Sequence, residues 1–329
     1  MISVVMATYN GEKFLYQQLL SIYHQTMQPD EVMIFDDGSS DNTIYLVKDF
    51  IRRNGLADKW SITVNQENKG FFRNFMDGAF AAHGDTIYFS DQDDIWDLKK
   101  IEVLEKCLNK PAVMMARSNV LKIDAKGKAI SSPEYVGKKT LRELSITDIC
   151  KWAGPGFSMG FRRKVFDFIK ERHLYRETFK YHDVLCGKAA VALGKCVQAR
   201  DVYDCHRLHD SNQTQTATRS FVAGRTRADQ IDIVRRRKKY FRLLDEATVD
   251  NTRAECFRRF SAFAGYRERY IKHFSINDMN WLIKHQDLYL SKVGVISDTM
   301  YSIGMEKIIL YFLEASGYFV GKIPACGYN

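Results

Sequence analysis

The chain has 329 residues, 45% of them hydrophobic, and a formal net charge of +9 at pH 7. This length allows one large domain or two, with a substantial buried core. Proline is scarce, no repeat is visible, and no run of about 18 apolar residues occurs, so we expect neither disorder nor a transmembrane helix. The N-terminus opens directly into a strand-like run, so we expect no secretory signal.

The seven cysteines include no C-x-x-C pair. An odd number without paired spacing argues against a zinc site and against a disulfide framework. We therefore expect reduced thiols, as in the cytosol.

Four short apolar runs in the first 90 residues each end at a polar cluster. The runs have strand length and are β-branched or aromatic, while the stretches between them have helical periodicity. This alternation predicts an α/β fold with a parallel sheet and right-handed crossovers, whose carboxyl ends gather at one edge. The polar clusters should therefore meet in space. The runs are residues 3–7, 32–35, 60–64 and 86–90, followed by T-Y-N, D-D-G-S, N-Q-E-N and D-Q-D-D.

The rest of the chain predicts further strands and helices, and a change of character near its end. A hairpin-type turn is expected at residues 124–127, and a loop at residues 153–156. Beyond about residue 220 the pattern is helical almost to the end. The other expected elements are strands at 112–123, 158–161 and 197–207, and helices at 97–108, 164–172 and 182–193.

The acidic clusters predict a site for a cation and a phosphate-bearing ligand. Asp91 and Asp93 alternate on a strand end, so they can offer hard oxygens to one metal that substrate phosphates complete. Either Asp36 or Asp37 can accept from a base or a ribose, with the Gly38 turn allowing close approach. The alternative is that these acids only form turns and cap helices. The absence of G-x-G-x-x-G and of a Walker lysine argues against dinucleotide cofactors and P-loop chemistry.

Four motifs together resemble the family 2 glycosyltransferases over roughly the first 210 residues: A-T-Y-N-G at 7–11, D-D-G-S-S-D-N-T at 36–43, N-Q-E-N-K-G at 65–70 and S-D-Q-D-D-I-W at 90–96. The resemblance implies a GT-A fold, which is Rossmann-like with a mostly parallel central sheet flanked by helices, and inverting transfer from a nucleotide-sugar donor. A later C-H-R-L-H-D-S-N at 205–212 looks most like the rhamnosyltransferase-like branch.

The resemblance also implies roles on the donor side. Asp36 or Asp37 would hold the pyrimidine or the ribose, and the sequence does not choose between them. Asp91 and Asp93 would contact the ribose and a divalent metal, Mn²⁺ or Mg²⁺, with Asp93 as the first choice of ligand. His209 resembles the histidine that reaches the metal or the diphosphate, although a histidine here is also compatible with an ordinary surface position. The residues that would line the nucleotide pocket are Thr8, Tyr9, Asn10, Lys69 and Gly70.

On the acceptor side, Asp183 occupies the place of the family's general base. His182 precedes it where the family more often has an acid, which leaves open whether a neighbouring group tunes Asp183. The alternative is that Asp183 only caps its helix. Gly156 and Phe157 belong to a G-P-G-F-S-M-G stretch that resembles the acceptor loop, and Trp96 is a second stacking candidate; each aromatic ring is equally compatible with the core.

The C-terminal region is basic. Residues 219–273 hold 15 Lys/Arg against 7 Asp/Glu, a net charge of +8. We therefore expect a catalytic domain at 1–215 and a basic helical extension at 216–329. Its cations and aromatics are compatible with a solvated face packed on the catalytic domain or with amphipathic helices on an anionic membrane leaflet. Nucleic-acid binding is disfavoured because no known motif accompanies the charge.

The leading hypothesis is a cytoplasmic inverting glycosyltransferase at the inner face of the cell membrane. It would move a sugar from a dTDP- or UDP-sugar, with L-rhamnose one candidate, to a lipid-linked saccharide in bacterial surface polysaccharide synthesis. The alternatives are a nucleotidyltransferase of the same fold class and a non-catalytic nucleotide-sugar-binding protein. A homo-oligomer is compatible with the sequence, which does not fix the oligomeric state.

Overall fold

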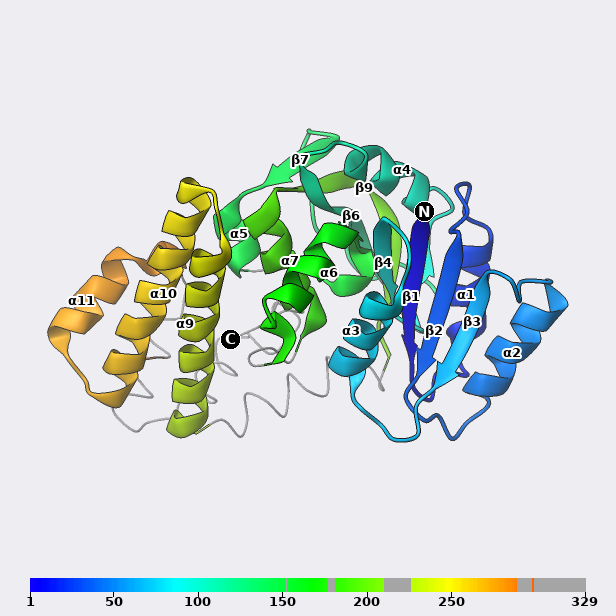
Figure 1. The fold of residues 1–329 in the computed structure, drawn as a ribbon, viewed down its shortest axis with the longest axis horizontal. Coiled ribbons are helices and arrows are strands. Elements are labelled where there is room, and N and C mark those ends of the chain that lie inside the picture. Colours follow the sequence, from blue (N-terminus) through cyan, green and yellow to red (C-terminus); the bar gives the residue numbers. More distant parts are fainter. Residues whose placement is uncertain (152, 177–180, 210–225, 289–297, 299–329) are drawn as a thin grey trace. The chain divides into compact units, whose positions relative to one another are not determined.

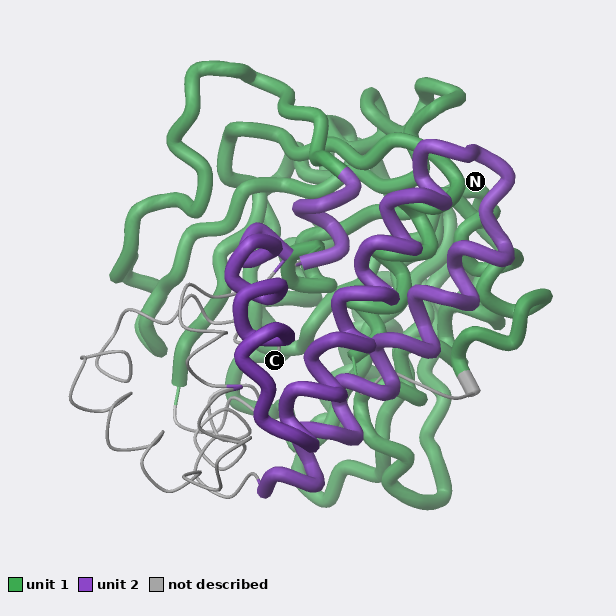
Figure 2. Tube along the Cα trace, turned by 90° about the vertical axis from the view of Figure 1, so that its left-hand side faces the viewer, with its two compact units in different colours: residues 1–145, 153–175, 179–209 green, residues 146–152, 176–178, 210–329 purple. Residues whose placement is uncertain are grey.

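The computed structural model describes residues 1–151, 153–176, 181–209, 226–288 and 298 (Figure 1). They divide into two compact units (Figure 2). The described part of unit 1 is residues 1–145, 153–175 and 181–209; that of unit 2 is residues 146–151, 176, 226–288 and 298. The expected domain boundary after residue 215 lies outside the described residues and stays a prediction.

The first half of unit 1 is the parallel sheet that the sequence predicts. Its strand order is β3-β2-β1-β4, and all three pairings are parallel. Both Val4 and Val5 of β1 are fully buried although they point to opposite faces, because α1 packs on the Val4 side and α3 on the Val5 side. The elements are β1 (Ile2–Thr8), α1 (Leu15–Tyr23), β2 (Glu31–Asp36), α2 (Thr43–Arg53), β3 (Trp60–Val64), α3 (Phe71–Ala81) and β4 (Thr86–Ser90).

The second half of unit 1 makes the sheet mixed. β8 (Met159–Arg162) lies antiparallel between β4 and β6 (Val113–Ile123), and β6 pairs in parallel with β9 (Lys195–Arg207). Two short strands, β5 (Ile95–Trp96) and β7 (Leu141–Leu144), add antiparallel to β9. They are too short to show a period of two, so no local pattern in the sequence predicts them.

Helices and short 3₁₀ turns complete unit 1. The expected helix at 182–193 is confirmed as α7 (His182–Leu193), whereas the helix expected from residue 97 begins only at Lys100 because β5 and a turn come first. The other helices are α4 (Lys100–Leu108) and α6 (Arg163–Glu171), and η1 (Gly156–Ser158) and η2 (Leu174–Arg176) are 3₁₀ turns, the last residue of η2 falling in unit 2.

Unit 2 is helical, which confirms the expected helical C-terminal extension. The Thr226 hydroxyl and the Asp229 carboxylate form a capping box at the start of α9, and Asp250 caps α10 by accepting from Arg253 N at 2.9 Å. Tyr240 and Phe257 are fully buried inside the unit. Its elements are α5 (Ile146–Lys151), α9 (Arg227–Ala247), α10 (Asn251–Lys272), α11 (Ile276–Lys284) and η3 (Gln286–Leu288). Among the described residues, no helix has both the length and the apolar character needed to cross a membrane.

Candidate active site

Three parallel strands of unit 1 end side by side, and their loops are bonded to one another. In the sheet register Thr8 of β1 lies opposite Asp36 of β2, and the Thr8 hydroxyl donates to Asp36 Oδ2 at 2.8 Å. Across β1 and β4, Tyr9 N donates to Gln92 Oε1 at 2.9 Å and Gln92 Nε2 donates to Tyr9 O at 3.0 Å. The carboxyl ends of these strands therefore form one polar edge.

Asn10 joins the loop after β1 to the loop after β2. Its φ of 48° is in the left-handed region, which asparagine tolerates better than most residues. Asn10 N donates to the Ser39 hydroxyl and Asn10 Oδ1 accepts from Ser40 N, both at 2.9 Å. The predicted nucleotide-pocket residues Thr8, Tyr9 and Asn10 are thus fixed by neighbouring loops.

Asp36 and Asp37 are both buried, and each accepts several hydrogen bonds from protein donors. Asp36 accepts from Gly38 N at 3.1 Å and from the Ser39 N and hydroxyl at 2.8 and 2.6 Å, in addition to Thr8. Asp37 organises a different loop, because it accepts from Asn65 Nδ2 at 2.9 Å and from Lys69 N and Gly70 N at 2.8 Å each. Both carboxylates shape the edge, and direct nucleotide contact stays a prediction for either.

The carboxylates after β4 differ from Asp36 and Asp37 in their hydrogen-bond partners and in their pKa values. Desolvation, and then the charges of Asp94 and Asp93, raise the pKa of Asp91 well above 3.8. Asp94 is fully buried, and its Oδ1 accepts from Arg207 N and pairs with His206 Nδ1, both at 3.0 Å. Its Oδ2 is buried without a hydrogen-bond partner among the described residues, and burial raises its pKa. The described side chains therefore compensate the negative charge of this part of the edge only in part.

His209 and Asp93, which the sequence predicts as metal ligands, are in direct contact. Their Nε2 and Oδ2 atoms are 2.8 Å apart, and the His209 ring packs on Phe14 with centroids 4.7 Å apart. The structure therefore brings the end of β9 to the loop after β4, over a separation of 116 residues.

Two neighbours of His209 on β9 also belong to the site, although sequence reasoning gave them no role. Burial works to lower the pKa of His206, but the charges of Asp94, Asp93 and Asp91 outweigh it and raise that pKa. The buried Arg207 guanidinium donates to Asp93 O at 3.0 Å, to Gln17 Oε1 at 2.6 Å and to the backbone of the turn after β6. The H-R-x-H spacing was the signal that could have identified both.

Asp183, the predicted base, is the second residue of α7 and is 5% exposed. Tyr181 is the N-cap, so Asp183 is not the capping residue, and its Oδ1 accepts from Val184 N at 2.7 Å. The charge of Asp183 contributes to the raised pKa of Asp91. The candidate base and the acidic cluster are therefore close enough to interact electrostatically.

His182 is buried between aromatic rings and the glycine loop. It stacks on Phe75 with centroids 4.1 Å apart, and burial lowers its pKa to about 3, so the imidazole is neutral. Neither ring nitrogen has a hydrogen-bond partner among the described residues. A Cβ on Gly156 would lie 2.5 Å from His182 Nε2, so only glycine fits at Gly156 without displacing His182.

Trp96 and Phe157, the predicted stacking platforms, are 2% and 4% exposed. The Trp96 ring lies under Lys100 Nζ, 3.4 Å from the ring centroid, and Phe157 stacks on His206 with centroids 4.8 Å apart. Neither ring presents an open face in this structure, so a direct contact with acceptor would need the loop to move. Their acceptor role stays a prediction.

The residues fit a divalent cation only with the help of a ligand. Among the described residues no three His, Cys, Asp or Glu side chains form a ready metal cage. Asp91, Asp93 and His209 nevertheless offer hard oxygens and an imidazole, and the orphaned Asp94 Oδ2 marks uncompensated charge beside them. This donor set suits a metal whose coordination is completed by phosphate oxygens.

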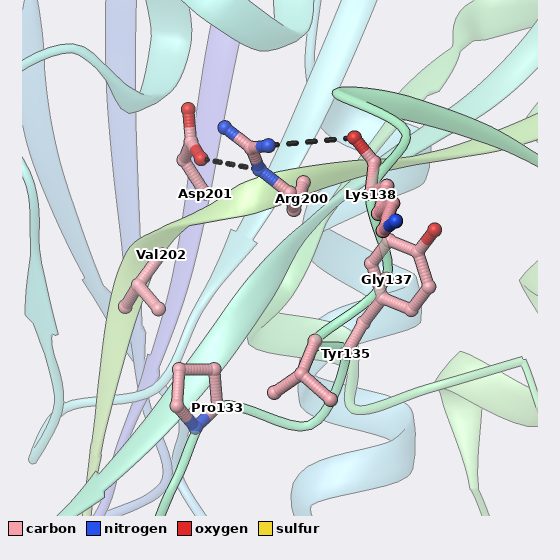
Figure 3. Close-up of a pocket in the computed structure, with 8 residues that line it drawn as sticks. Pro133, Tyr135, Gly137, Lys138, Arg200, Asp201 and Val202 are labelled. Carbon is pink, nitrogen blue, oxygen red and sulfur yellow. Dashed lines mark hydrogen bonds and ion pairs between the residues drawn. The ribbon is translucent and has the colours of Figure 1, made fainter.

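A surface cavity of about 470 Å³ lies elsewhere in unit 1, between β9 and the segment before β7 (Figure 3). Arg200 at its wall pairs with Asp201 at 3.1 Å and donates to Lys138 O at 3.4 Å. None of the predicted site residues lines it.

The signature of glycosyl transferase family 2 matches residues 3–169, which is half of the chain and contains β1 to β8. The chain belongs to glycosyl transferase family 2. It is 38% identical over 106 residues to the dTDP-rhamnosyl transferase RfbG of Shigella flexneri, covering 31% of this chain and 36% of that protein.

A second relative is the UDP-Glc:alpha-D-GlcNAc-diphosphoundecaprenol beta-1,3-glucosyltransferase WfgD of Escherichia coli, 28% identical over 42% of this chain and 50% of that protein. The chain thus matches half or less of the length of these curated relatives. The crystal structure of S. aureus TarS 1–349 in complex with UDP-GlcNAc has a similar fold, with a TM-score of 0.65 and 16% sequence identity. The alignment covers 98% of this chain and 93% of the TarS chain. This likeness shows that the two share a fold and confirms the expected GT-A architecture.

Proposed function

We propose that this protein transfers a sugar from a nucleoside-diphosphate donor to a hydroxyl of a saccharide acceptor, with inversion at the anomeric carbon. One observation carries the proposal: His209, just after β9, meets Asp93 after β4, with Nε2 and Oδ2 2.8 Å apart, beside the polar edge of the family 2 domain. Asp183 on α7 is close enough to this acidic cluster to contribute to the raised pKa of Asp91. Such an edge suits a reaction in which a proton leaves one substrate and negative charge develops on the other.

In the proposed reaction Asp183 accepts the proton of the acceptor hydroxyl while its oxygen attacks the anomeric carbon. The bond to the diphosphate breaks in the same displacement, so the sugar inverts and no covalent enzyme intermediate forms. The residues of the polar edge orient the donor; Thr8, Tyr9, Asn10, Asp36 or Asp37, Lys69 and Gly70 are the proposed contacts. Orientation of both substrates supplies much of the rate enhancement.

Asp93, His209 and Asp91 would hold a divalent cation, Mn²⁺ or Mg²⁺. When bound, the cation neutralises the charge that develops on the departing diphosphate. Arg207 keeps the Asp93 backbone in place, and Gln92 ties the same loop to Tyr9.

For the substrates we propose a dTDP- or UDP-sugar as donor and a lipid-linked saccharide as acceptor. The partial match to a dTDP-rhamnosyl transferase supports L-rhamnose as one candidate sugar. The match to an enzyme named for a diphosphoundecaprenol-linked acceptor supports the lipid-linked class and a role in bacterial surface polysaccharide synthesis.

We also propose that unit 2 attaches the enzyme to the inner face of the cell membrane. Its helices carry most of the net charge, and Phe274 and Ile276 at the α10–α11 turn and Ile283 near the end of α11 are 49%, 62% and 44% exposed. Exposed apolar side chains beside cations suit an anionic lipid surface. Co-sedimentation with anionic vesicles that weakens with salt, and is absent with zwitterionic vesicles, supports this; binding to neither contradicts it.

The decisive experiment is a thermal-shift screen of nucleoside diphosphates and nucleotide sugars, with and without Mn²⁺ or Mg²⁺, followed by transfer assays with lipid-diphosphate saccharides. A donor raises Tm because it binds only the native state. We expect one nucleotide class to raise Tm, more so with metal. If no nucleotide sugar raises Tm and no transfer occurs, the proposed function is wrong.

A further inference from the structure

Lys100 is a fully buried lysine that lies outside the carboxylate cluster. It is the first residue of α4, and its ammonium donates to Asp204 Oδ1 and to Phe157 O, both at 2.6 Å. The Ser118 hydroxyl donates to the second oxygen of Asp204, and the Trp96 ring covers the ammonium. All of these residues belong to unit 1.

Burying the charges of Lys100 and Asp204 makes an unfavourable contribution to the free energy of folding. Burial lowers the pKa of Lys100 to about 8 and raises that of Asp204 to about 6, so both are charged near pH 7 but by a narrow margin. A buried ion pair adds little or nothing to stability compared with an apolar pair of the same volume. The role of the ion pair therefore lies in the segment that it holds in place.

The ion pair holds the loop around Phe157. The Phe157 carbonyl is bound by Lys100, and the Phe157 ring stacks on His206 at an interplanar angle of 16°. The preceding residue, Gly156, has no room for a side chain, because a Cβ there would lie 2.5 Å from His182 Nε2 and 3.2 Å from Asp183 Cβ. The loop is thus fixed on one side to α4 and β9 and abuts the start of α7 on the other.

We propose that Lys100 is a positioning residue that fixes the loop at residues 154–158 against Asp183 and thereby sets where the acceptor hydroxyl meets the base. Asp204 keeps the lysine charged and aimed, and Trp96 closes the cavity around it. Trp96 then serves the acceptor side through Lys100, by a cation–π contact, rather than by stacking on a sugar. The role of this loop in acceptor binding rests on the proposed function.

The test is Lys100→Met combined with Asp204→Asn, which removes both charges and leaves no buried ion alone. The matched control is Lys106→Met with Glu102→Gln, a 2.6 Å pair on the same helix whose lysine is 68% exposed. Amide hydrogen exchange is measured on each full-length protein without substrate. We expect the amides of residues 156–159 to exchange at least about tenfold faster in the first variant, which corresponds to 1.4 kcal/mol of lost protection. The amides of β1 and β4, and the control protein, should keep wild-type rates.

Unchanged exchange at residues 156–159 overturns the proposal, and so does a uniform rise across the sheet, because that would show a general structural role. If the double variant does not fold, Lys100→Gln combined with Asp204→Asn replaces it; the shorter amide at position 100 can still donate to the amide oxygen at position 204, no buried ion is left alone, and the same local rise is expected. With the donor and acceptor that the wild-type protein turns over, the acceptor KM should rise about tenfold and the donor KM should not. If the wild type shows no transfer, the proposed function is wrong. Hydrogen exchange still tests whether Lys100 fixes the loop at residues 154–158.

Discussion

The carboxylates at the end of β2 and those after β4 lie on the same sheet edge but are satisfied in different ways. Asp36 and Asp37 accept hydrogen bonds from backbone and side-chain donors of the neighbouring loops. Asp91 and Asp94 have raised pKa values instead, and Asp94 Oδ2 has no donor among the described residues. One region uses acids to hold loops, and the other holds acids that need a proton or a cation.

This difference separates the acids that hold the loops from the acids that are candidates for ligand binding. A carboxylate that accepts several hydrogen bonds attracts a cation less strongly, whereas a buried one with few donors needs a proton or a metal. Substitutions in the two regions should therefore have different effects: loss of activity without loss of stability after β4 and on α7, and loss of stability, with donor binding falling as a consequence, after β2.

The largest effect is expected for Asp183→Asn. The amide keeps the shape of the side chain but cannot accept the proton, so transfer should fall by about 10² to 10⁴-fold. Donor binding, measured by thermal shift, should remain near the wild-type level. Asp167→Asn on the neighbouring helix α6 serves as the control. Near-normal turnover by Asp183→Asn would remove Asp183 from the mechanism.

Next in size is His209→Ala, which removes the partner of Asp93 Oδ2. We expect the metal concentration that supports half-maximal transfer to rise roughly 10 to 100-fold. The same variant should lose the extra Tm that Mn²⁺ adds to a bound nucleoside diphosphate. His83→Ala, whose ring is exposed and pairs with Glu31, is the control. A metal response identical to wild type would exclude His209 as a ligand.

Asp37→Ala should act mainly on stability. It removes the acceptor of Lys69 N and one of the two acceptors of Gly70 N, so we expect a loss of about 3 kcal/mol in the free energy of unfolding, measured by urea titration. The loop at residues 65–70 should become more open to proteolysis and the donor affinity should fall as a consequence. Full stability combined with lost donor binding would place Asp37 with the ligand-binding acids instead.

The smallest effect is expected for the buried pair of Lys100 and Asp204. The folded-state pKa of Asp204 is about 6 and its ordinary value is 3.8, so the wild-type protein loses stability as the pH rises between these values. Lys100 is lowered from 10.5 to about 8, so stability is regained as the pH rises between about 8 and 10.5. The Lys100→Met, Asp204→Asn variant should therefore melt a few degrees above the wild type at pH 7, and this advantage should shrink at both pH extremes. A Tm difference independent of pH would contradict the charged pair.

Much of the edge could be predicted from the sequence, because its signals are local. The apolar runs that became β1 to β4 and the polar residues after them lie within a few positions of each other, and strand length and alternation are properties of single segments. The parallel order and the meeting of the four strand ends then follow from general rules of α/β topology. The start of α7 at His182 was equally visible.

Only the tertiary structure decided which of these acids have hydrogen-bond or ion-pair partners. Asp37 finds donors 28 to 33 residues away, Asp93 meets His209 across 116 residues, and Lys100 meets Asp204 across 104. Burial of Trp96 and Phe157 likewise depends on partners from β9 and α4 that no local pattern reveals. Sequence periodicity reports how a segment folds, whereas the state of a buried charge depends on which distant groups share its low-dielectric surroundings, and only packing determines that.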